Sequence, residues 1–158
     1  MVDTVEWQKL AGALREVHRT LLERARRDYE REHFVTLSPG ELLQLLTTNA
    51  EFEWLRGLSE LMVDIDLIGD AAPLHRDELA TAIRPAVEHL ISKTPDPATP
   101  FARYYWPHVQ DDPHVAMAHA GLKNALNAWP QAPQDNASTL LHERHRLAEK
   151  ARHLSRRS

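Results

Sequence analysis

Histidine is the residue type most able to do chemistry in this chain, which contains ten His and no Cys in 158 residues. His binds metal ions and titrates near neutral pH, whereas the lack of Cys excludes a thiol nucleophile, disulfides and Cys-ligated metal centres. His18 lies between Leu14 and Leu21 on an apolar helical stripe, and His119 lies on the inner side of a later helix. Because buried polar groups need partners, these two His are the first candidates for a site.

Asp64 flanks the apolar arc of another predicted helix, so His18, His119 and Asp64 could form a ligand or metal pocket inside a helical bundle. The spacing fits no familiar metal template. A ferritin-like di-iron centre needs two Glu-x-x-His pairs, and only Glu30 with His33 matches, at a helix end. The alternative is that these side chains are core groups with ordinary hydrogen-bond partners. The sequence therefore leaves any metal undetermined and predicts no cofactor.

A short aromatic stretch, FARYYWPHV, supplies two further candidates, Tyr104 and Trp106. Tyr and Trp are common in binding hot spots and ligand pockets, but they also cover the ends of helical bundles because they bury so much area. The chain contains no GxSxG, P-loop, Rossmann glycine or HExxH pattern. The sequence thus predicts no enzyme.

Apolar residues repeat every three or four positions through most of the chain, which predicts helices. Ser38, Pro39 and Glu41 form a capping box that starts a short helix. We expect one helix over 74–93 to kink at Pro85, where a backbone donor is missing. The helices are expected over 3–33, 39–47, 50–68, 74–93, 100–110, 113–129 and 139–156. They predict an all-α fold: an elaborated four-helix bundle with two short helices and a C-terminal basic helix.

The length fits one hydrophobic core. We expect residues 1–130 to form the bundle domain, and residues 131–158 to be a linker and a helix that packs on the same domain or on a second copy. No apolar run approaches the length of a membrane span, and the first residues lack the basic-then-apolar pattern of a secretory signal. These features predict a cytoplasmic protein.

Charge is distributed unevenly along the chain, although the net charge is only −4 and the pI is near 6.2. Residues 49–80 carry eight acids and two Arg, and residues 142–158 carry six basic residues and two acids. The acidic total argues against nucleic-acid binding as a function. The complementary regions favour docking of the C-terminal helix, either within one chain or between two copies as a homodimer.

Three stretches, SPGELLQLLT, EFEWLRGLSELMVDID and PFARYYWPHVQDDPHVAMAHAGLKNAL, resemble a family of small all-helical bacterial proteins without an assigned activity. The resemblance spans roughly residues 14–129 and implies a bacterial, all-helical protein. Our leading hypothesis is a non-catalytic helical interaction or regulatory module that binds a protein partner or itself. The alternative is a ligand or metal carrier that uses His and carboxylates inside the bundle.

Overall fold

The computed structural model describes residues 2–70, 80–93, 100–130, 146–150 and 152–153. Within these ranges the chain forms helices and no strand, which confirms the all-α prediction. The helices are α1 (Thr4–His33), α2 (Pro39–Thr48), the 3₁₀ helix η1 (Ala50–Leu55), α3 (Arg56–Gly69), α5 (Ile83–Leu90), α6 (Phe101–Asp111) and α7 (Pro113–Asn127).

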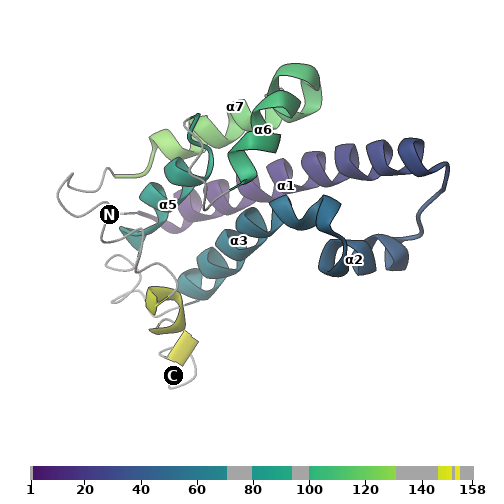
Figure 1. Cartoon of the computed structure of the whole chain (residues 1–158). Helices are drawn as coiled ribbons and strands as arrows, with labels where there is room; N and C mark the ends of the chain where they lie inside the picture. The colour runs from purple at the N-terminus through teal and green to yellow at the C-terminus, as the bar shows by residue number, and fades with distance from the viewer. Residues whose placement is uncertain (1, 71–79, 94–99, 131–145, 151, 154–158) are drawn as a thin grey trace.

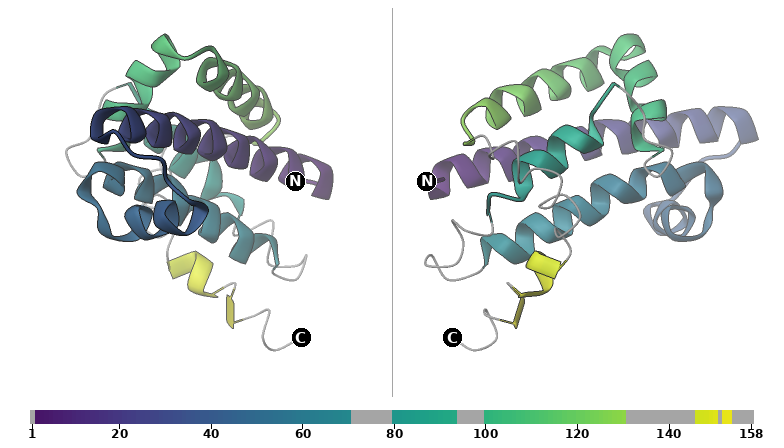
Figure 2. Two further views of the ribbon diagram at one scale, coloured as in Figure 1. Left: turned by 90° about the vertical axis from the view of Figure 1, so that its right-hand side faces the viewer. Right: turned by 60° about the vertical axis from the view of Figure 1, so that its left-hand side comes forward.

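The long helix α1 runs through the centre of the molecule (Figures 1 and 2). It packs along α7 on one side and along α3 on the other, while α6 packs on α7 and α5 packs on α3. The last turns of α1 extend beyond α7 to one end of the molecule, where α2 folds back beside them. The finer prediction of a four-helix bundle stays a prediction.

Side-chain caps explain where most of these helices begin. Each capping oxygen accepts a hydrogen bond from a backbone N–H that the first turn leaves without an internal partner. The caps and their donors are Asp3 with Glu6 at 2.7 Å, Ser38 with Glu41 at 3.2 Å, Asn49 with Glu51 at 2.8 Å and Asp112 with His114 at 2.9 Å.

Two helix predictions need correction. The helix expected over 50–68 starts as the 3₁₀ helix η1, whose three-residue repeat puts Phe52 and Leu55 on one buried side. The expected kink at Pro85 is wrong for the described residues, because a turn at 81–82 precedes α5 and Pro85 lies in the first turn of that helix. A missing N–H breaks no internal hydrogen bond there. Residues 74–79 of that prediction lie outside the described residues.

One hydrophobic core connects the helices. Helical residues 146–150 also contribute to it, since Ala148 is only 1% exposed. Of the predicted linker and helix, residues 131–145, 151 and 154–158 lie outside the part of the chain that the structure describes. Among the described helices, none has the combination of length and apolar character that a membrane span requires.

The capping box of α2 gives a direct stability test. Ser38 Oγ accepts from Glu41 N, and Glu41 Oε2 accepts from Ser38 N at 3.1 Å, so the predicted box is confirmed. We expect Ser38→Ala to lower the free energy of unfolding by about 1 kcal/mol, because a helix donor loses its acceptor. Ser38→Asp, which keeps an acceptor, serves as the control in thermal unfolding. Equal stability of the Ala variant and the native chain would contradict a capping role.

Candidate functional site

The hairpin formed by the end of α1, residues 34–38 and α2 is the best candidate for a binding surface. α1 ends at Phe34, whose backbone adopts the left-handed conformation with φ of 55° and whose N–H donates to Glu30 O. The Glu30 side chain then accepts from Leu37 N at 2.8 Å and from the Arg26 guanidinium at 2.8 Å. The turn is therefore held in one shape by hydrogen bonds on both sides.

Phe34 is unusual in both conformation and exposure. Left-handed backbone costs an L-residue with a side chain roughly 1–2 kcal/mol, so Gly normally occupies such helix ends. Here a bulky aromatic residue occupies it, and its side chain is 93% exposed. Neither backbone preference nor burial within the chain accounts for a Phe at this position, whereas contact with a partner would.

The helix α2 leaves its apolar side chains exposed or only partly covered. It contains four Leu in ten residues, yet none of its residues is buried, and Leu43 is 64% exposed. Full burial of a Leu side chain stabilises a fold by about 1.5–3 kcal/mol, which α2 does not gain within this chain. We call the exposed side chains of Phe34, Val35 and Leu43, with the groove beside them, the hairpin surface.

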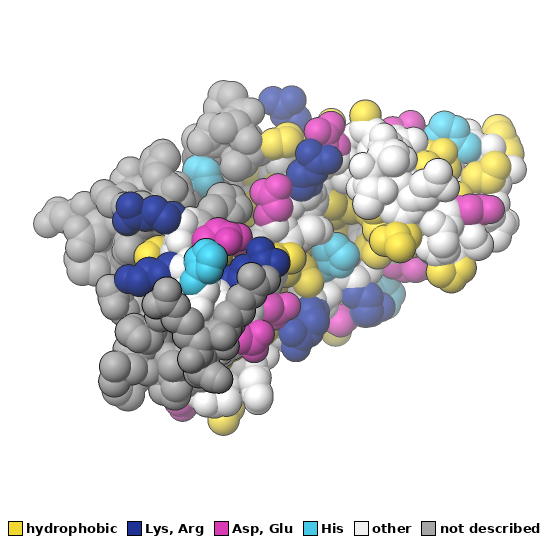
Figure 3. Space-filling model, turned by 90° about the horizontal axis from the view of Figure 1, so that it is seen from below, with side chains coloured by type: hydrophobic (Ala, Val, Ile, Leu, Met, Phe, Trp, Pro, Cys, Tyr) yellow, Lys and Arg dark blue, Asp and Glu magenta, His cyan; other side chains and the backbone are white. Residues whose placement is uncertain are grey.

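The groove between α1 and α2 has a volume of about 600 Å³. Apolar and polar side chains line it together: Tyr29, Val35, Thr36, Leu37, Glu41, Gln44, Leu45 and Thr48. Seen from below, this end of the molecule has hydrophobic atoms with acidic groups near them and no Lys or Arg (Figure 3). The groove has Val35, Leu37 and Leu45 in its lining and can thus accept an apolar side chain beside the carboxylate of Glu41.

Glu32, His33 and Glu51 are the group of possible metal ligands that the described residues bring together, with ligand atoms within 4.8 Å of one another. His33 Nε2 lies 3.4 Å from Glu51 Oε1. All three side chains are exposed, so coordination of an ion by them would have to compete with the hydration of the ion and of the side chains by water. The group adds acidic character beside the hairpin surface and does not by itself define a metal centre.

The sequence-predicted residue His119 lies in an aromatic cluster between α6 and α7. Its Nδ1 is 2.6 Å from the Tyr105 hydroxyl, and its ring meets the Trp106 ring edge-on at 4.9 Å. Burial, and then the charges of Lys123 and Lys93, lower the pKa of His119. Burial also raises the pKa of Tyr105. The arrangement fits a protonated Tyr105 that donates to a neutral His119, which is a structural hydrogen bond of the core.

The other predicted site residues lie elsewhere. His18 is partly buried on α1, with Nε2 3.4 Å from the Ser59 hydroxyl of α3, and burial lowers its pKa. Asp64 is buried on α3.

Tyr104 is 47% exposed and stacks on Trp54 of η1 at 5.5 Å. Trp106 donates to Ile91 O at 3.1 Å, with Lys93 Nζ 4.9 Å from its ring.

The structure thus brings His119 and Trp106 together, and it does not gather His18, His119 and Asp64 into a metal-binding group within the described residues. Sequence reasoning missed the hairpin surface. One signal was available: the run Leu42, Leu43, Leu45 and Leu46 spreads Leu over more of a ten-residue helix than one face can bury.

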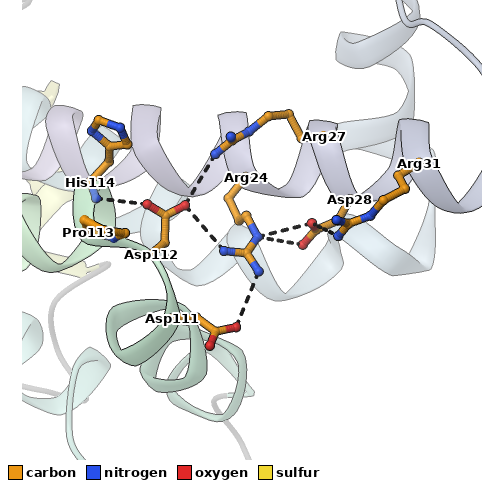
Figure 4. A pocket seen from close by; sticks show the side chains of 8 residues that line it. All are labelled: Arg24, Arg27, Asp28, Arg31, Asp111, Asp112, Pro113 and His114. Carbon is orange, nitrogen blue, oxygen red and sulfur yellow. Dashed lines mark hydrogen bonds and ion pairs between the residues drawn. The ribbon is translucent and has the colours of Figure 1, made fainter.

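A second cleft, of about 510 Å³, lies where α1 meets the α6–α7 corner (Figure 4). Arg24, Arg27 and Arg31 line it together with three Asp. Asp112 Oδ2 lies 3.4 Å from both the Arg24 and the Arg27 guanidinium, and Arg24 Nε lies 3.0 Å from Asp28 Oδ2. Since each Arg faces a carboxylate, the cleft is a salt-bridge network that joins α1 to α7.

Asp112 is the centre of that network and is only 6% exposed. Burial raises the pKa of its carboxyl, but hydrogen bonds from the His114 and Val115 N–H groups and from Arg24 outweigh burial and lower it overall. The carboxylate is therefore ionised at neutral pH and serves both as the cap of α7 and as the partner of two Arg. Its arrangement indicates a role in stability.

Comparisons of this chain with protein-family models, with curated proteins and with solved structures gave no match. The resemblance to small bacterial helical proteins therefore stays a prediction from the sequence.

Proposed function

We propose that this chain is a non-catalytic helical interaction module that binds a protein partner on the hairpin surface. The observation that carries the proposal is Phe34, an exposed aromatic side chain on strained backbone beside a helix without a buried residue. Exposed apolar groups on a hydrogen-bonded frame bind at low entropic cost, because little has to be ordered on association. A bacterial source and a cytoplasmic location remain predictions from the sequence.

Self-association through the C-terminal helix was the other partner hypothesis. The described part of that helix has its Ala148 in the core of its own chain, where Leu147 also packs. That apolar face is therefore at least partly covered without a second copy. The hairpin surface has no such cover among the described residues, which favours it as the docking site.

Phe34→Gly separates binding from folding. Gly adopts the left-handed conformation without strain. We therefore expect the free energy of unfolding of the variant to equal that of the native chain or to exceed it by about 1 kcal/mol, although the docking side chain is gone. Met117→Ser is the matched control, because Met117 is an exposed apolar residue on α7. Partners captured by the tagged chain are identified by mass spectrometry, purified and titrated against all three proteins.

The proposal predicts a partner that the purified native chain and Met117→Ser bind equally, and that Phe34→Gly binds at least about tenfold more weakly, as for a hot-spot residue. Equal binding by all three proteins would place docking elsewhere. A Phe34→Gly variant that is less stable than the native chain would show that Phe34 supports the fold.

A further inference from the structure

We infer that the occupant of the hairpin surface is an amphipathic helix with basic residues flanking its apolar face. This inference rests on the proposed docking function and adds the chemistry of the partner. It follows from three features of the hairpin: its charge, its backbone hydrogen bonds and its groove.

The charge of the hairpin together with the adjoining η1 is strongly negative. Residues 28–53 contain six acidic residues and one Arg, a net charge of −5, and residues 32–55 contain four Glu and no Lys or Arg. The one Arg, Arg31, pairs with Asp28 at 2.9 Å. Glu32, Glu41 and Glu51 are all exposed, and the view from below shows acidic groups among the hydrophobic atoms at this end of the molecule (Figure 3). A partner with Lys or Arg beside its apolar contacts would be steered to this surface and held in register.

Most backbone N–H groups of the turn already have hydrogen-bond partners. Val35 N donates to Glu30 O at 3.1 Å, Leu37 N donates to the Glu30 carboxylate and Ser38 N donates to the Glu41 carboxylate. Strand addition relies on a row of unpaired backbone groups, and three of the four N–H groups of residues 35–38 are already paired. Recognition must therefore come from side chains.

The groove suits a helix. Its lining comes from Tyr29 of α1, from residues 35–37 and from one face of α2, and it mixes apolar with polar side chains. A helix that presents anchors on one face can place them in such a groove while its flanks reach the rim. On this surface the flanks meet Glu41 along the groove, and Glu32 and Glu51 beside it.

A second copy of the chain is a poor occupant because of the negative charge of the hairpin. Twofold pairing would set each acidic hairpin against its own copy, and like charges across an interface disfavour association. The basic C-terminal segment of the same chain is also a poor candidate. Its described residues lie near α3 at the end of the molecule away from the hairpin, with Ala148 in the core (Figures 1 and 2).

Synthetic peptides test on the intact chain whether basic flanking residues favour binding to the hairpin surface. Three amphipathic peptides of about 18 residues, roughly 27 Å as a helix, share one Leu face and carry Lys, Gln or Glu at all other positions. Binding is measured by fluorescence anisotropy at low and high salt, and the contact surface is mapped by hydrogen exchange. The proteins are the native chain, Phe34→Gly, Met117→Ser and the double variant Glu32→Gln/Glu51→Gln.

We expect the Lys peptide to bind the native chain at least about tenfold more tightly than the Glu peptide, and to weaken as salt rises. Hydrogen exchange should slow in residues 29–48. Phe34→Gly should weaken all peptide binding, whereas Glu32→Gln/Glu51→Gln should weaken the Lys peptide more than the Gln peptide. Met117→Ser should bind the Lys peptide and the Gln peptide as the native chain does.

Each other outcome overturns the inference in a distinct way. Equal or tighter binding of the Gln or Glu peptide at the hairpin would overturn the basic partner and leave docking itself intact. Protection outside residues 29–48, or no binding of the Lys peptide, would overturn the helical partner, while the capture experiment with Phe34→Gly still decides the proposed function. If the native chain forms concentration-dependent dimers that Phe34→Gly abolishes, the occupant of the hairpin surface is a second copy of the chain and not a basic helix.

Discussion

Replacing Asp112 with Ala is expected to lower the free energy of unfolding by about 2–3 kcal/mol, because one side chain has two roles. An N-cap contributes about 1 kcal/mol and at most about 2. Asp112 also faces Arg24 and Arg27, and removal of a buried partner leaves a charge less well compensated. Arg24 keeps its contacts with Asp28 at 3.0 and 3.1 Å, so the second contribution is modest. Urea unfolding at neutral pH measures the loss.

Asp111→Ala is the matched control for this prediction. Asp111 precedes Asp112 and also faces Arg24, at 3.5 Å, but its side chain is 70% exposed and it does not cap α7. Exposed ion pairs contribute about 0–1 kcal/mol, so we expect a loss of less than about 1 kcal/mol. Asp112→Asn keeps a capping oxygen without the charge and should lie between the two Ala variants. Equal losses for Asp111→Ala and Asp112→Ala would refute the central role of Asp112.

The Asp112 effect should also depend on pH in a defined direction. The pKa of Asp112 is lower in the folded chain than the ordinary value near 3.9 that applies after unfolding. The stabilisation is therefore fully present above about pH 4–5 and is lost as pH falls through the folded pKa. The stability difference between the native chain and Asp112→Ala should shrink in that acidic window and stay constant from there to neutral pH.

Helix starts were predictable from the sequence because caps act over two or three residues. Asp3, Ser38, Asn49 and Asp112 each accept from a backbone N–H close by in the chain. The all-α class followed from apolar periodicity for a similar reason, since one helical face is defined by residues three or four positions apart. The Pro85 kink failed because periodicity continues across a short turn and does not reveal it.

The candidate site was harder to predict because it depends on what packing leaves uncovered. His18 and His119 attracted attention as polar residues on apolar faces, and each lies beside a hydroxyl, from Ser59 and Tyr105, on a different helix. Those partners are 41 and 14 positions away, beyond the reach of local spacing. Exposure of Phe34 and Leu43 depends on α1 extending beyond α7 and α3, which only the tertiary arrangement reveals.

Gly69→Ala is expected to be strongly destabilising although it adds a single methyl group. A Cβ at Gly69 would lie 2.6 Å from Trp7 Nε1, closer than real Cβ atoms come to other atoms. The Trp7 ring cannot easily move, because it is buried and its centroid is 5.2 Å from that of Trp129, which follows the end of α7. Overpacking of a rigid core costs about 1–3 kcal/mol, so the α1, α3 and α7 ends should separate slightly and the melting temperature should fall.

Gly121→Ala makes the same chemical change where nothing opposes it. Apart from its chain neighbours and the backbone of its own helix, no atom lies within 4 Å of a Cβ at Gly121, which is in the interior of α7. Ala favours a helix over Gly by about 0.5–1 kcal/mol, so this variant should be more stable than the native chain. The two substitutions should therefore shift the thermal midpoint in opposite directions, with near-UV circular dichroism changing only for Gly69→Ala. A thermal midpoint that rises for both variants would mean that the Trp7 ring relaxes freely and that the α1–α3 contact is loosely packed.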